Sequence, residues 1–297
     1  MKKQKVLVTG ALGFVGSNLV DMLVSQGYEV YGIDNLSSES SSLDYKNQFC
    51  EYFIRDVEDV CSIYNYKGLK FDKIFHLAAM ARIQPSFEVP YDYFKSNTLG
   101  TAAVCELARL TECKSLVYAT TSSKNHGTPY LTPYTYSKVA GEGIVKTYAE
   151  CFGMNMSMCT FYNVYGPREP REGEWATVVA KFTRQWQEGA DITVVGDGEQ
   201  SRDFTHVEDI CKGLIAASEG NWKGDNFDLG RGVPIKIIDI AKKLCSNEGG
   251  RWINVPLRKN EGQFTLSNWL KTKKSIGWRA ETDLMDYLHN IVHTYSS

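Results

Sequence analysis

The sequence predicts an α/β fold, with a doubly wound parallel sheet followed by a smaller C-terminal part. Apolar strand patterns alternate with helical patterns from the first residues on, and this alternation loosens after residue 165. With 297 residues, of which 43% are hydrophobic, the chain can form one large domain or two unequal ones. We expect a sheet domain over residues 1–165 and a second domain over 166–297, with parts of 203–240 returning to the first.

The expected elements follow one another without a break. The segment KVLVTG predicts a first strand, a helix follows from about Gly16 to Gln26, and EVYGID predicts a second strand, which completes a βαβ unit. Further strands and helices alternate after it: KIFHLAA, a helix over about 91–112, SLVYAT, a helix over about 134–152, and MNMSMCTFYNV. Strands joined in this way run parallel, and their helices cover both faces of the sheet.

Composition and charge restrict the function classes. The net charge is only −2 and no basic stripe is present, so we expect neither a nucleic-acid nor a membrane-surface partner. The apolar run in MKKQKVLVTG is too short for a signal peptide, and no segment reaches membrane-spanning length. Eight scattered cysteines without C-x-x-C spacing fit reduced thiols. We therefore expect a cytoplasmic protein with a small-molecule partner.

A metal site is not expected either. The segment HNIVH places His289 and His293 one helical turn apart, but it lacks the glutamate of H-E-x-x-H, and no third ligand is evident. Exposed surface histidines are the better interpretation.

A glycine-rich turn follows the first strand. In VLVTGALGFVGSNLV the glycines Gly10, Gly13 and Gly16 stand between a strand and a helix. Glycines at such a turn let the backbone approach a pyrophosphate, whose charge is stabilised at the helix N-terminus. Strand, loop and helix come in the order that this motif requires, so the sequence predicts a dinucleotide site.

An acidic residue ends the second strand. Asp34 follows Gly16 by 18 residues, where a carboxylate can accept hydrogen bonds from ribose hydroxyls and would repel a 2′-phosphate. NAD is therefore favoured over NADP, although an Asp-Asn pair can also serve as a turn or helix cap. The serine-rich run Ser37 to Ser42 comes directly after this strand, which favours a loop next to the cofactor over a linker between domains.

Ordered motifs along nearly the whole chain resemble the extended short-chain dehydrogenase/reductase family, which includes nucleotide-sugar epimerases, dehydratases and decarboxylases. They include VTGALGFVGSNLV, HLAA, SNTLGT, YTYSK, FYNVYGPR and GDGEQSRDFTHVEDI. The resemblance implies a Rossmann-type NAD-binding domain and a smaller C-terminal substrate-binding domain. It implies these cofactor-binding residues: Gly10, Gly13, Phe14, Val15, Gly16, Asp34, Asn35, Asp56, Val57, Leu77, Ala78, Ala79, Tyr134 and Lys138.

The segment TPYTYSK offers two tyrosines and one lysine. Tyr134 and Lys138 are four residues apart and share one helix face, whereas Tyr136 and Lys138 point to different sides. Spacing thus selects Tyr134, which matches the catalytic tyrosine of the family. A nearby ammonium and an oxidised nicotinamide both favour the phenolate, so Tyr134 can remove a proton from a sugar hydroxyl. A helix start in which both side chains only pack is the alternative.

A cluster of hydroxyl residues follows the strand SLVYAT. By resemblance, Thr121 matches the catalytic Ser/Thr position and Ser122 is the second candidate. Dehydratases of the family carry an Asp-Glu pair after the Thr, and decarboxylases carry a Glu where Ser123 stands. The resemblance therefore implies a 4-epimerase. The segment Lys124 to His126 departs from the usual Val-Tyr-Gly.

The resemblance also implies a site for a nucleotide-diphosphate sugar. Asn163 and Arg202 match residues that hold the diphosphate, Arg258 matches a second arginine, and Thr265 matches the back of the sugar pocket. Arg82 and Ser86 match positions that line the sugar site. The small Thr265 leaves room for an N-acetylated hexose.

The expected function is an NAD-dependent nucleotide-sugar 4-epimerase, most simply acting on UDP-glucose and UDP-galactose. A nucleotide-sugar oxidoreductase and a UDP-uronate epimerase of the same family are the rival enzymes, and a catalytically silent NAD-binding scaffold is the rival outside enzymes. Family resemblance further implies a homodimer formed through the two long helices.

Overall fold

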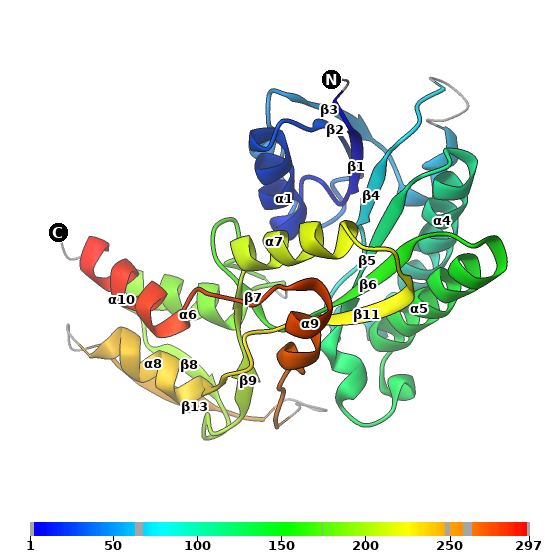
Figure 1. Cartoon of the computed structure of the whole chain (residues 1–297). Helices are drawn as coiled ribbons and strands as arrows, with labels where there is room; N and C mark the ends of the chain where they lie inside the picture. Colours follow the sequence, from blue (N-terminus) through cyan, green and yellow to red (C-terminus); the bar gives the residue numbers. More distant parts are fainter. Residues whose placement is uncertain (1–2, 63–67, 174, 247–249, 258–262, 296–297) are drawn as a thin grey trace.

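The computed structural model describes residues 3–62, 68–173, 175–246, 250–257 and 263–295. A seven-stranded sheet in the order β11-β6-β5-β4-β1-β2-β3 forms its centre (Figure 1), and every neighbouring pair of strands in it is parallel. The α/β fold class predicted from the sequence is confirmed. The strands are β1 (Lys5–Thr9), β2 (Glu29–Asp34), β3 (Cys50–Ile54), β4 (Lys73–His76), β5 (Ser115–Thr121), β6 (Met156–Phe161) and β11 (Lys223–Leu229).

Helices cover both faces of this sheet, because successive side chains of a strand point to opposite faces. Val6 and Val8 of β1 pack with α1 (Phe14–Ser25) and α7 (Val207–Ser218) on one face. Leu7, between them, packs on the other face with α4 (Gly100–Leu110) and α5 (Pro133–Phe152). Figure 1 shows α1 and α7 on one side of the sheet and α4 and α5 on the other.

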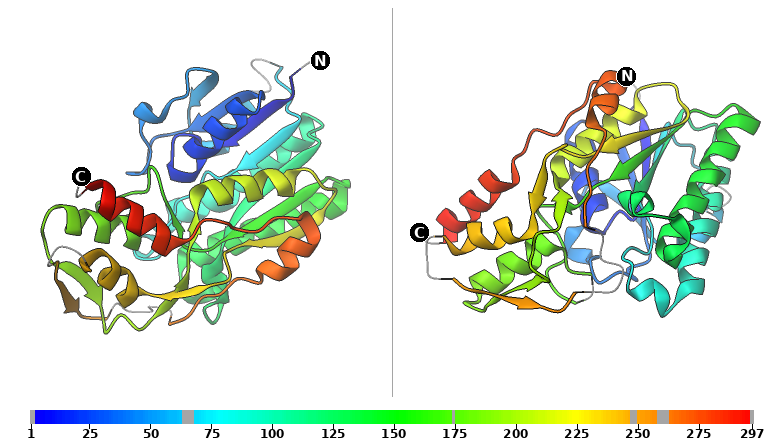
Figure 2. Two further views of the ribbon diagram at one scale, coloured as in Figure 1. Left: turned by 60° about the vertical axis from the view of Figure 1, so that its left-hand side comes forward. Right: turned by 90° about the horizontal axis from the view of Figure 1, so that it is seen from below.

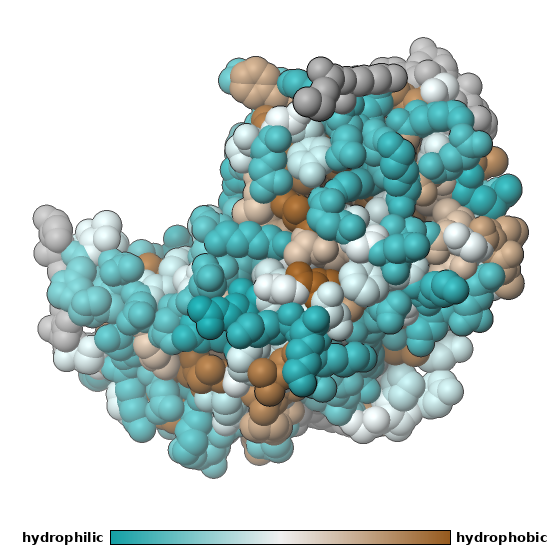
Figure 3. Space-filling model, in the orientation of Figure 1, coloured by the Kyte–Doolittle hydropathy of each residue, from teal (hydrophilic) through white to brown (hydrophobic). Residues whose placement is uncertain are grey.

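A third hydrophobic cluster forms the smaller lobe, which projects from the sheet in both views of Figure 2. Its helices are α6 (Val178–Gln187), α8 (Ile237–Cys245) and α10 (Leu284–Tyr295). Six short strands form three two-stranded sheets: β7 (Val164–Tyr165) with β10 (Thr205–His206), β9 (Ser201–Asp203) with β12 (Pro234–Lys236), and β8 (Ile192–Val195) with β13 (Trp252–Val255). Helix α9 (Trp269–Ile276) packs against β11. The face seen in Figure 3 is mainly hydrophilic, with apolar residues in small separate patches.

Two features differ from the sequence expectations. Strand β3 has no counterpart among the predicted strands, because its CEYFI segment is short and mixed in polarity. The single helix expected over 91–112 is divided into α3 (Pro90–Phe94), a π-helical turn η4 (Lys95–Leu99) and α4. A π turn inserts one extra residue into the helix. Side chains at the turn therefore point in a different direction from the one that hydrophobic periodicity predicts.

Candidate functional site

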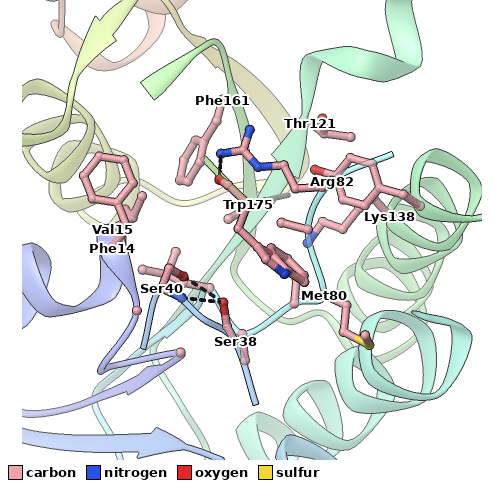
Figure 4. A pocket seen from close by; sticks show the side chains of 18 of the residues that line it. Phe14, Val15, Ser38, Ser40, Met80, Arg82, Thr121, Lys138, Phe161 and Trp175 are labelled. Carbon is pink, nitrogen blue, oxygen red and sulfur yellow. Dashed lines mark hydrogen bonds between the residues drawn. The ribbon is translucent and has the colours of Figure 1, made fainter. Parts of the chain in front are cut away.

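A cavity of about 560 Å³ opens at the carboxyl ends of the sheet strands, between the sheet and the smaller lobe (Figure 4). Ligands of doubly wound folds bind at this edge of the sheet. Most of the residues that the sequence predicts for the site line this one cavity. These are Gly10, Gly13, Phe14, Val15, Gly16, Asp34, Asn35, Val57, Leu77, Ala78, Ala79, Arg82, Thr121, Ser122, Tyr134, Lys138, Asn163, Arg202 and Thr265.

Two predicted residues do not line the cavity, and a third is not among the described residues. The carboxylate of Asp56 accepts a 2.8 Å hydrogen bond from Asn35 and does not line the cavity. Ser86 is buried, and its hydroxyl donates to the carbonyl of Ile83 at 2.6 Å, so it orders its own turn. Arg258 lies outside the described residues.

The glycine loop makes a close backbone cradle at the start of α1. Gly10 has φ +70°, and a Cβ there would lie 2.8 Å from the main-chain nitrogen of Ala78. A Cβ on Gly16 would lie 1.9 Å from the carbonyl oxygen of Gly10. Both positions therefore require glycine, and the loop presents main-chain atoms to the cavity in front of a helix N-terminus.

The carboxylate of Asp34 lies at the end of β2 and is 7% exposed. Its two oxygens accept hydrogen bonds from the amides of Leu12 at 3.0 Å and Leu36 at 2.8 Å. Each carboxylate oxygen has a further lone pair, so Asp34 can order this turn and also accept from ribose hydroxyls. The cradle and this carboxylate together fit an NAD molecule. Ser37, Ser38, Ser40 and Ser41 line the cavity beside them, as expected of a loop next to the cofactor.

The segment after β4 is held by hydrogen bonds from β1 and from the π-helical turn η4. The hydroxyl oxygen of Thr9 accepts from the amides of Leu77 and Ala78 at 3.2 and 3.1 Å. Asn97, in the π-helical turn, accepts from the amide of Met80 at 2.7 Å and donates to its carbonyl at 2.9 Å. The π turn thus aims Asn97 at the cavity wall, a contact that the sequence pattern does not indicate.

His76 is a structural residue beneath this wall. Its ring nitrogens are hydrogen bonded to Thr9 at 2.8 Å and Thr101 at 3.0 Å. Burial, and secondly the charge of Lys138, lower the pKa of His76 to about 3. A neutral imidazole with both nitrogens occupied has no free position for acid or base chemistry.

Helix α5 places Tyr134 and Lys138 in the cavity. Thr132 caps the helix by accepting from the amide of Thr135 at 3.0 Å, and Pro133 occupies the first turn. Tyr136 is 41% exposed and contacts the rings of Phe94 and Tyr130 instead. Lys138 is 4% exposed, and its ammonium lies 4.3 Å from the centre of the Tyr118 ring.

The electrostatics of Tyr134 differ from the expectation in one respect. Burial raises the pKa of Tyr134, whereas a hydrogen bond with the Thr121 side chain and the charge of Arg82 lower it. The cation that acts on the phenol here is Arg82, so the expected effect of Lys138 stays a prediction. Burial lowers the pKa of Lys138 itself to about 7, with the charge of Glu142 opposing this and that of Lys124 adding to it.

Thr121 is the hydroxyl residue that pairs with Tyr134. It ends β5, and its hydroxyl oxygen accepts from the amide of Ser123 at 3.2 Å, which begins the next turn. Ser122 lines the same cavity one residue further on. The hydrogen bond to Tyr134 distinguishes Thr121 from Ser122 as the partner of the phenol.

The far end of the cavity is built by three segments. The Asn163 amide donates to the carbonyl of Asp203 at 2.9 Å, and the Thr265 hydroxyl oxygen accepts from the amide of Asp203 at 3.2 Å. The Asp203 carboxylate accepts from the amides of Arg231 and Ser267, both at 2.9 Å. Asp203 therefore organises the wall that carries Arg202, although sequence reasoning did not single it out.

Arg82 and Trp175 close the cavity from the side of the smaller lobe. Arg82 has φ +81°, and its guanidinium donates a 2.6 Å hydrogen bond to the main-chain carbonyl of Trp175. Figure 4 shows the Arg82 side chain reaching toward Trp175, with Lys138 and Thr121 nearby. Trp175, Pro170 and Ala176 line the cavity from a loop whose sequence has no motif that would have identified them.

The structure was also searched for membrane-spanning helices and metal sites. Within the described ranges, no helix is both long and apolar enough to cross a membrane. In the same residues, no group of three or more His, Cys, Asp or Glu side chains could hold a metal ion, and the His289 and His293 rings contact each other at 4.1 Å.

Comparisons with known proteins identify the family of the chain. The model of the NAD dependent epimerase/dehydratase family matches residues 6–230. A UDP-glucose 4-epimerase of Mycolicibacterium smegmatis is 34% identical over 98% of both chains, and a UDP-glucuronate 4-epimerase of Thermodesulfobacterium geofontis is 29% identical over 97% of this chain and 94% of the other. The structure of a UDP-glucose 4-epimerase from Thermotoga maritima with UDP-glucose has a TM-score of 0.91 at 27% identity, over 99% of both chains.

Proposed function

Because the chain belongs to the NAD dependent epimerase/dehydratase family, we propose that it is an NAD-dependent nucleotide-sugar 4-epimerase, with UDP-glucose and UDP-galactose as its simplest substrates. One observation carries the proposal. Thr121, Tyr134 and Lys138 line the same cavity as the glycine cradle at one end and Asn163, Arg202 and Thr265 at the other. A dinucleotide and a nucleotide sugar can therefore meet at Tyr134.

NAD, when bound, takes up and returns the hydride of the sugar carbon. The chain contributes position and proton transfer. The glycine loop and Asp34 fit the pyrophosphate and a ribose, and Thr121 hydrogen bonds the reacting hydroxyl beside Tyr134. Tyr134 removes the proton of that hydroxyl and later returns it.

Lys138 contributes a buried ammonium on the same helix face as Tyr134, four residues further on. Asn163 and Arg202 hold the diphosphate while the oxidised sugar turns, because a guanidinium offers both charge and a planar set of donors. Thr265 leaves space at the back of the pocket for a hexose or its N-acetylated form.

The side chains after Thr121 speak against one other reaction of such sites, the elimination of water. Elimination of water needs an acid and a base next to the sugar, and Ser122 and Ser123 supply neither carboxylate. Reversible oxidation at a single carbon needs only the hydroxyl, the phenol and the cofactor. The same residues speak against a scaffold without activity, because Tyr134 and Thr121 are within hydrogen-bonding reach.

The test is incubation of the purified protein with UDP-glucose, without added NAD, and separation of the UDP-hexose products. We expect UDP-galactose to accumulate to an equilibrium ratio with no net change in absorbance at 340 nm. Stoichiometric NADH formation would identify an oxidoreductase instead. Incubation with other UDP-, GDP-, dTDP- and CDP-sugars, followed by product identification, defines the nucleotide and the sugar. Conversion of UDP-glucose without any conversion of UDP-N-acetylglucosamine would contradict the role given to Thr265.

A second candidate substrate is a UDP-uronate, because Arg82 brings a guanidinium close to Tyr134. Arginine binds a carboxylate through paired donors, which a neutral hydroxymethyl group cannot use. If this candidate is right, kcat/KM is higher for UDP-glucuronate than for UDP-glucose. The Arg82→Met variant should then lose about tenfold more of its kcat/KM for UDP-glucuronate than of its kcat/KM for UDP-glucose. Equal effects on the two substrates would exclude it.

The assembly that we propose is a homodimer formed through α3, η4, α4 and α5. Large apolar side chains are exposed along α3, η4 and α5, which suits burial against a second copy. They are Tyr91, Phe94, Leu99, Tyr136 and Phe152. Mass measurement by light scattering should give twice 33.4 kDa, and Leu99→Glu should lower it to that of one chain.

We also propose a cytoplasmic location, because cysteine thiols remain reduced there. All eight cysteine thiols are free in the structure, and Cys105, Cys159 and Cys211 are buried in the hydrophobic clusters. Fractionation of the cells that produce the protein tests this.

A further inference from the structure

A buried ion pair lies behind the lysine of the site. The Lys124 ammonium and the Glu142 carboxylate are 2.5 Å apart, with side chains only 16% and 14% exposed. The Thr120 hydroxyl donates to the same Glu142 oxygen at 2.5 Å. Burying two charges carries a desolvation penalty that often cancels their attraction, so such a pair is weak evidence for stability alone. Its location suggests another role.

The ion pair joins two elements that carry site residues. Glu142 follows Lys138 by four residues in α5, as Lys138 follows Tyr134, so the three side chains lie along one helix face. Lys124 belongs to the turn η5 (Ser122–Asn125), which directly follows Thr121. The segment Lys124 to His126, which departs from the usual family pattern, therefore contacts the face of α5 that carries the site.

Side chains of several elements interact with Lys138. The charges of Glu142 in α5 and Lys124 in η5 act on it. Its own charge acts on His76 in β4, and its ammonium lies over the ring of Tyr118 in β5. Among them, Glu142 is the carboxylate, and it favours the charged form of Lys138. Lys124 has the opposite effect. The two partners of the ion pair therefore act on Lys138 with opposite signs.

We propose that the Lys124–Glu142 ion pair positions Lys138 for the reaction. Glu142 attracts the Lys138 ammonium from the side away from the cavity. Because Lys124 already forms an ion pair with the Glu142 carboxylate, Lys138 does not form a full ion pair with it. The Lys138 side chain therefore stays directed into the cavity. Glu142 and Lys124 are positioning residues and touch neither substrate nor cofactor. This inference rests on the role of Lys138 in the proposed epimerisation.

The test compares Glu142→Gln, Lys124→Gln and the double variant with the unchanged protein. The first measurement is the pH dependence of kcat/KM for UDP-glucose or whichever UDP-sugar the panel identifies. Activity falls at high pH as Lys138 loses its proton. We expect this alkaline limb to move by about one pH unit to lower pH in Glu142→Gln and by a similar amount to higher pH in Lys124→Gln. The double variant should lie between them.

A structural tie between η5 and α5 would give a different result. Both single variants would then lose stability, and the alkaline limb would stay where it is, which would overturn the proposal. Arg109→Gln is the matched control, because Arg109 and Glu106 form a 2.6 Å ion pair on the neighbouring helix α4, away from the cavity. Its pH profile should be that of the unchanged protein.

A second measurement does not depend on activity. The titration of Lys138 is followed through the carbon-13 NMR signal of its Cε, assigned by its loss in Lys138→Met. Opposite shifts of this titration in Glu142→Gln and Lys124→Gln support the proposal even if no UDP-sugar is converted. If the pKa of Lys138 is the same in both single variants as in the unchanged protein, and the variants still epimerise the sugar, the ion-pair proposal is refuted and the proposed function stands. If Glu142→Gln does not fold, the pKa of Lys138 in Lys124→Gln decides: a higher pKa supports the proposal, and an unchanged pKa refutes it.

Discussion

The guanidinium of Arg82 spans the cavity to the main-chain carbonyl of Trp175, at 2.6 Å, from a residue with φ +81°. A non-glycine residue in this backbone region carries strain that the surrounding structure must hold in place. Burial raises the pKa of the Tyr134 phenol, and the positive charge of Arg82 beside it opposes this rise. Arg82 is thus in a position to influence both proton transfer and the choice of sugar.

Replacement of Arg82 tests the electrostatic part of this relationship. Arg82→Met keeps an apolar stem and removes the charge, so the pKa of Tyr134 should rise. Activity that needs the phenolate then appears at higher pH, and we expect the rising limb of the kcat/KM profile to move up by about one pH unit. Arg82→Lys, which keeps the charge, should move it less. A limb unchanged in Arg82→Met would show that Arg82 does not act on the phenol.

Tyr134 and Tyr136 form a matched pair for the chemical step. Tyr134→Phe removes the hydroxyl next to Thr121 and keeps the ring that packs edge-on against Tyr93 at 6.3 Å. We expect turnover to fall about 10²- to 10⁴-fold, with the thermal unfolding temperature nearly unchanged. Tyr136→Phe, on the exposed side of the same helix, should keep normal turnover. Similar turnover in both variants would remove Tyr134 from the mechanism.

Gly10 and Gly27 separate backbone strain from steric conflict. Both have positive φ, +70° and +86°, so alanine is strained by about 1 kcal/mol at either position. A Cβ at Gly10 meets the Ala78 backbone at 2.8 Å, whereas a Cβ at Gly27 has no atom within 4 Å.

We therefore expect Gly10→Ala to lose about 1–3 kcal/mol more than Gly27→Ala in urea unfolding. Gly10→Ala should also weaken NAD binding, measured by calorimetric titration, whereas Gly27→Ala should leave it intact. Equal losses in the two variants would mean that the approach of Gly10 to Ala78 has no consequence.

The part of the site that could be predicted from the sequence depends on local patterns. Gly10 and Asp34 stand at strand ends, and parallel strands bring their carboxyl ends to one edge, so their meeting in one cavity follows from the strand pattern. Tyr134 was selected over Tyr136 by helical spacing alone, and the exposure of Tyr136 agrees with this. In each case, residues close in the sequence are enough to predict where the side chain lies.

The rest depends on contacts between distant segments. Asp203 accepts amides from segments 28 and 64 residues away, and Arg82 contacts Trp175 across 93 residues. Nothing in the local sequence of the Trp175 loop indicates that it covers a cavity. Asn97 stands in the SNTLGT motif, but its contact with Met80 was not predicted, because the π turn that aims it there changes the helical register.

The buried charge of Lys138 should be measurable as lost stability. Burial lowers the pKa of Lys138 to about 7 in the folded chain, whereas an unfolded lysine titrates near 10.5. Below about pH 7 the residue is charged in both states, and the folded state bears the full penalty. As the pH rises from 7 to 10.5, only the folded chain releases the proton, so the penalty shrinks, and above both values it is gone. The penalty belongs to the charge and not to the alkyl chain.

Lys138→Met keeps a side chain of similar length and removes that charge. We expect the variant to be more stable than the unchanged protein by about 1–4 kcal/mol at pH 6, with a clearly smaller difference at pH 9. Urea unfolding at the two pH values measures this, and Lys146→Met, an exposed lysine of the same helix, is the control for removing a lysine from α5. A Lys138→Met variant that is less stable than the unchanged protein at pH 6 would mean that Tyr118 and Glu142 more than offset the desolvation of the ammonium. Attraction by these two groups would then stabilise the charged Lys138, and its pKa in the folded chain would be raised instead of lowered.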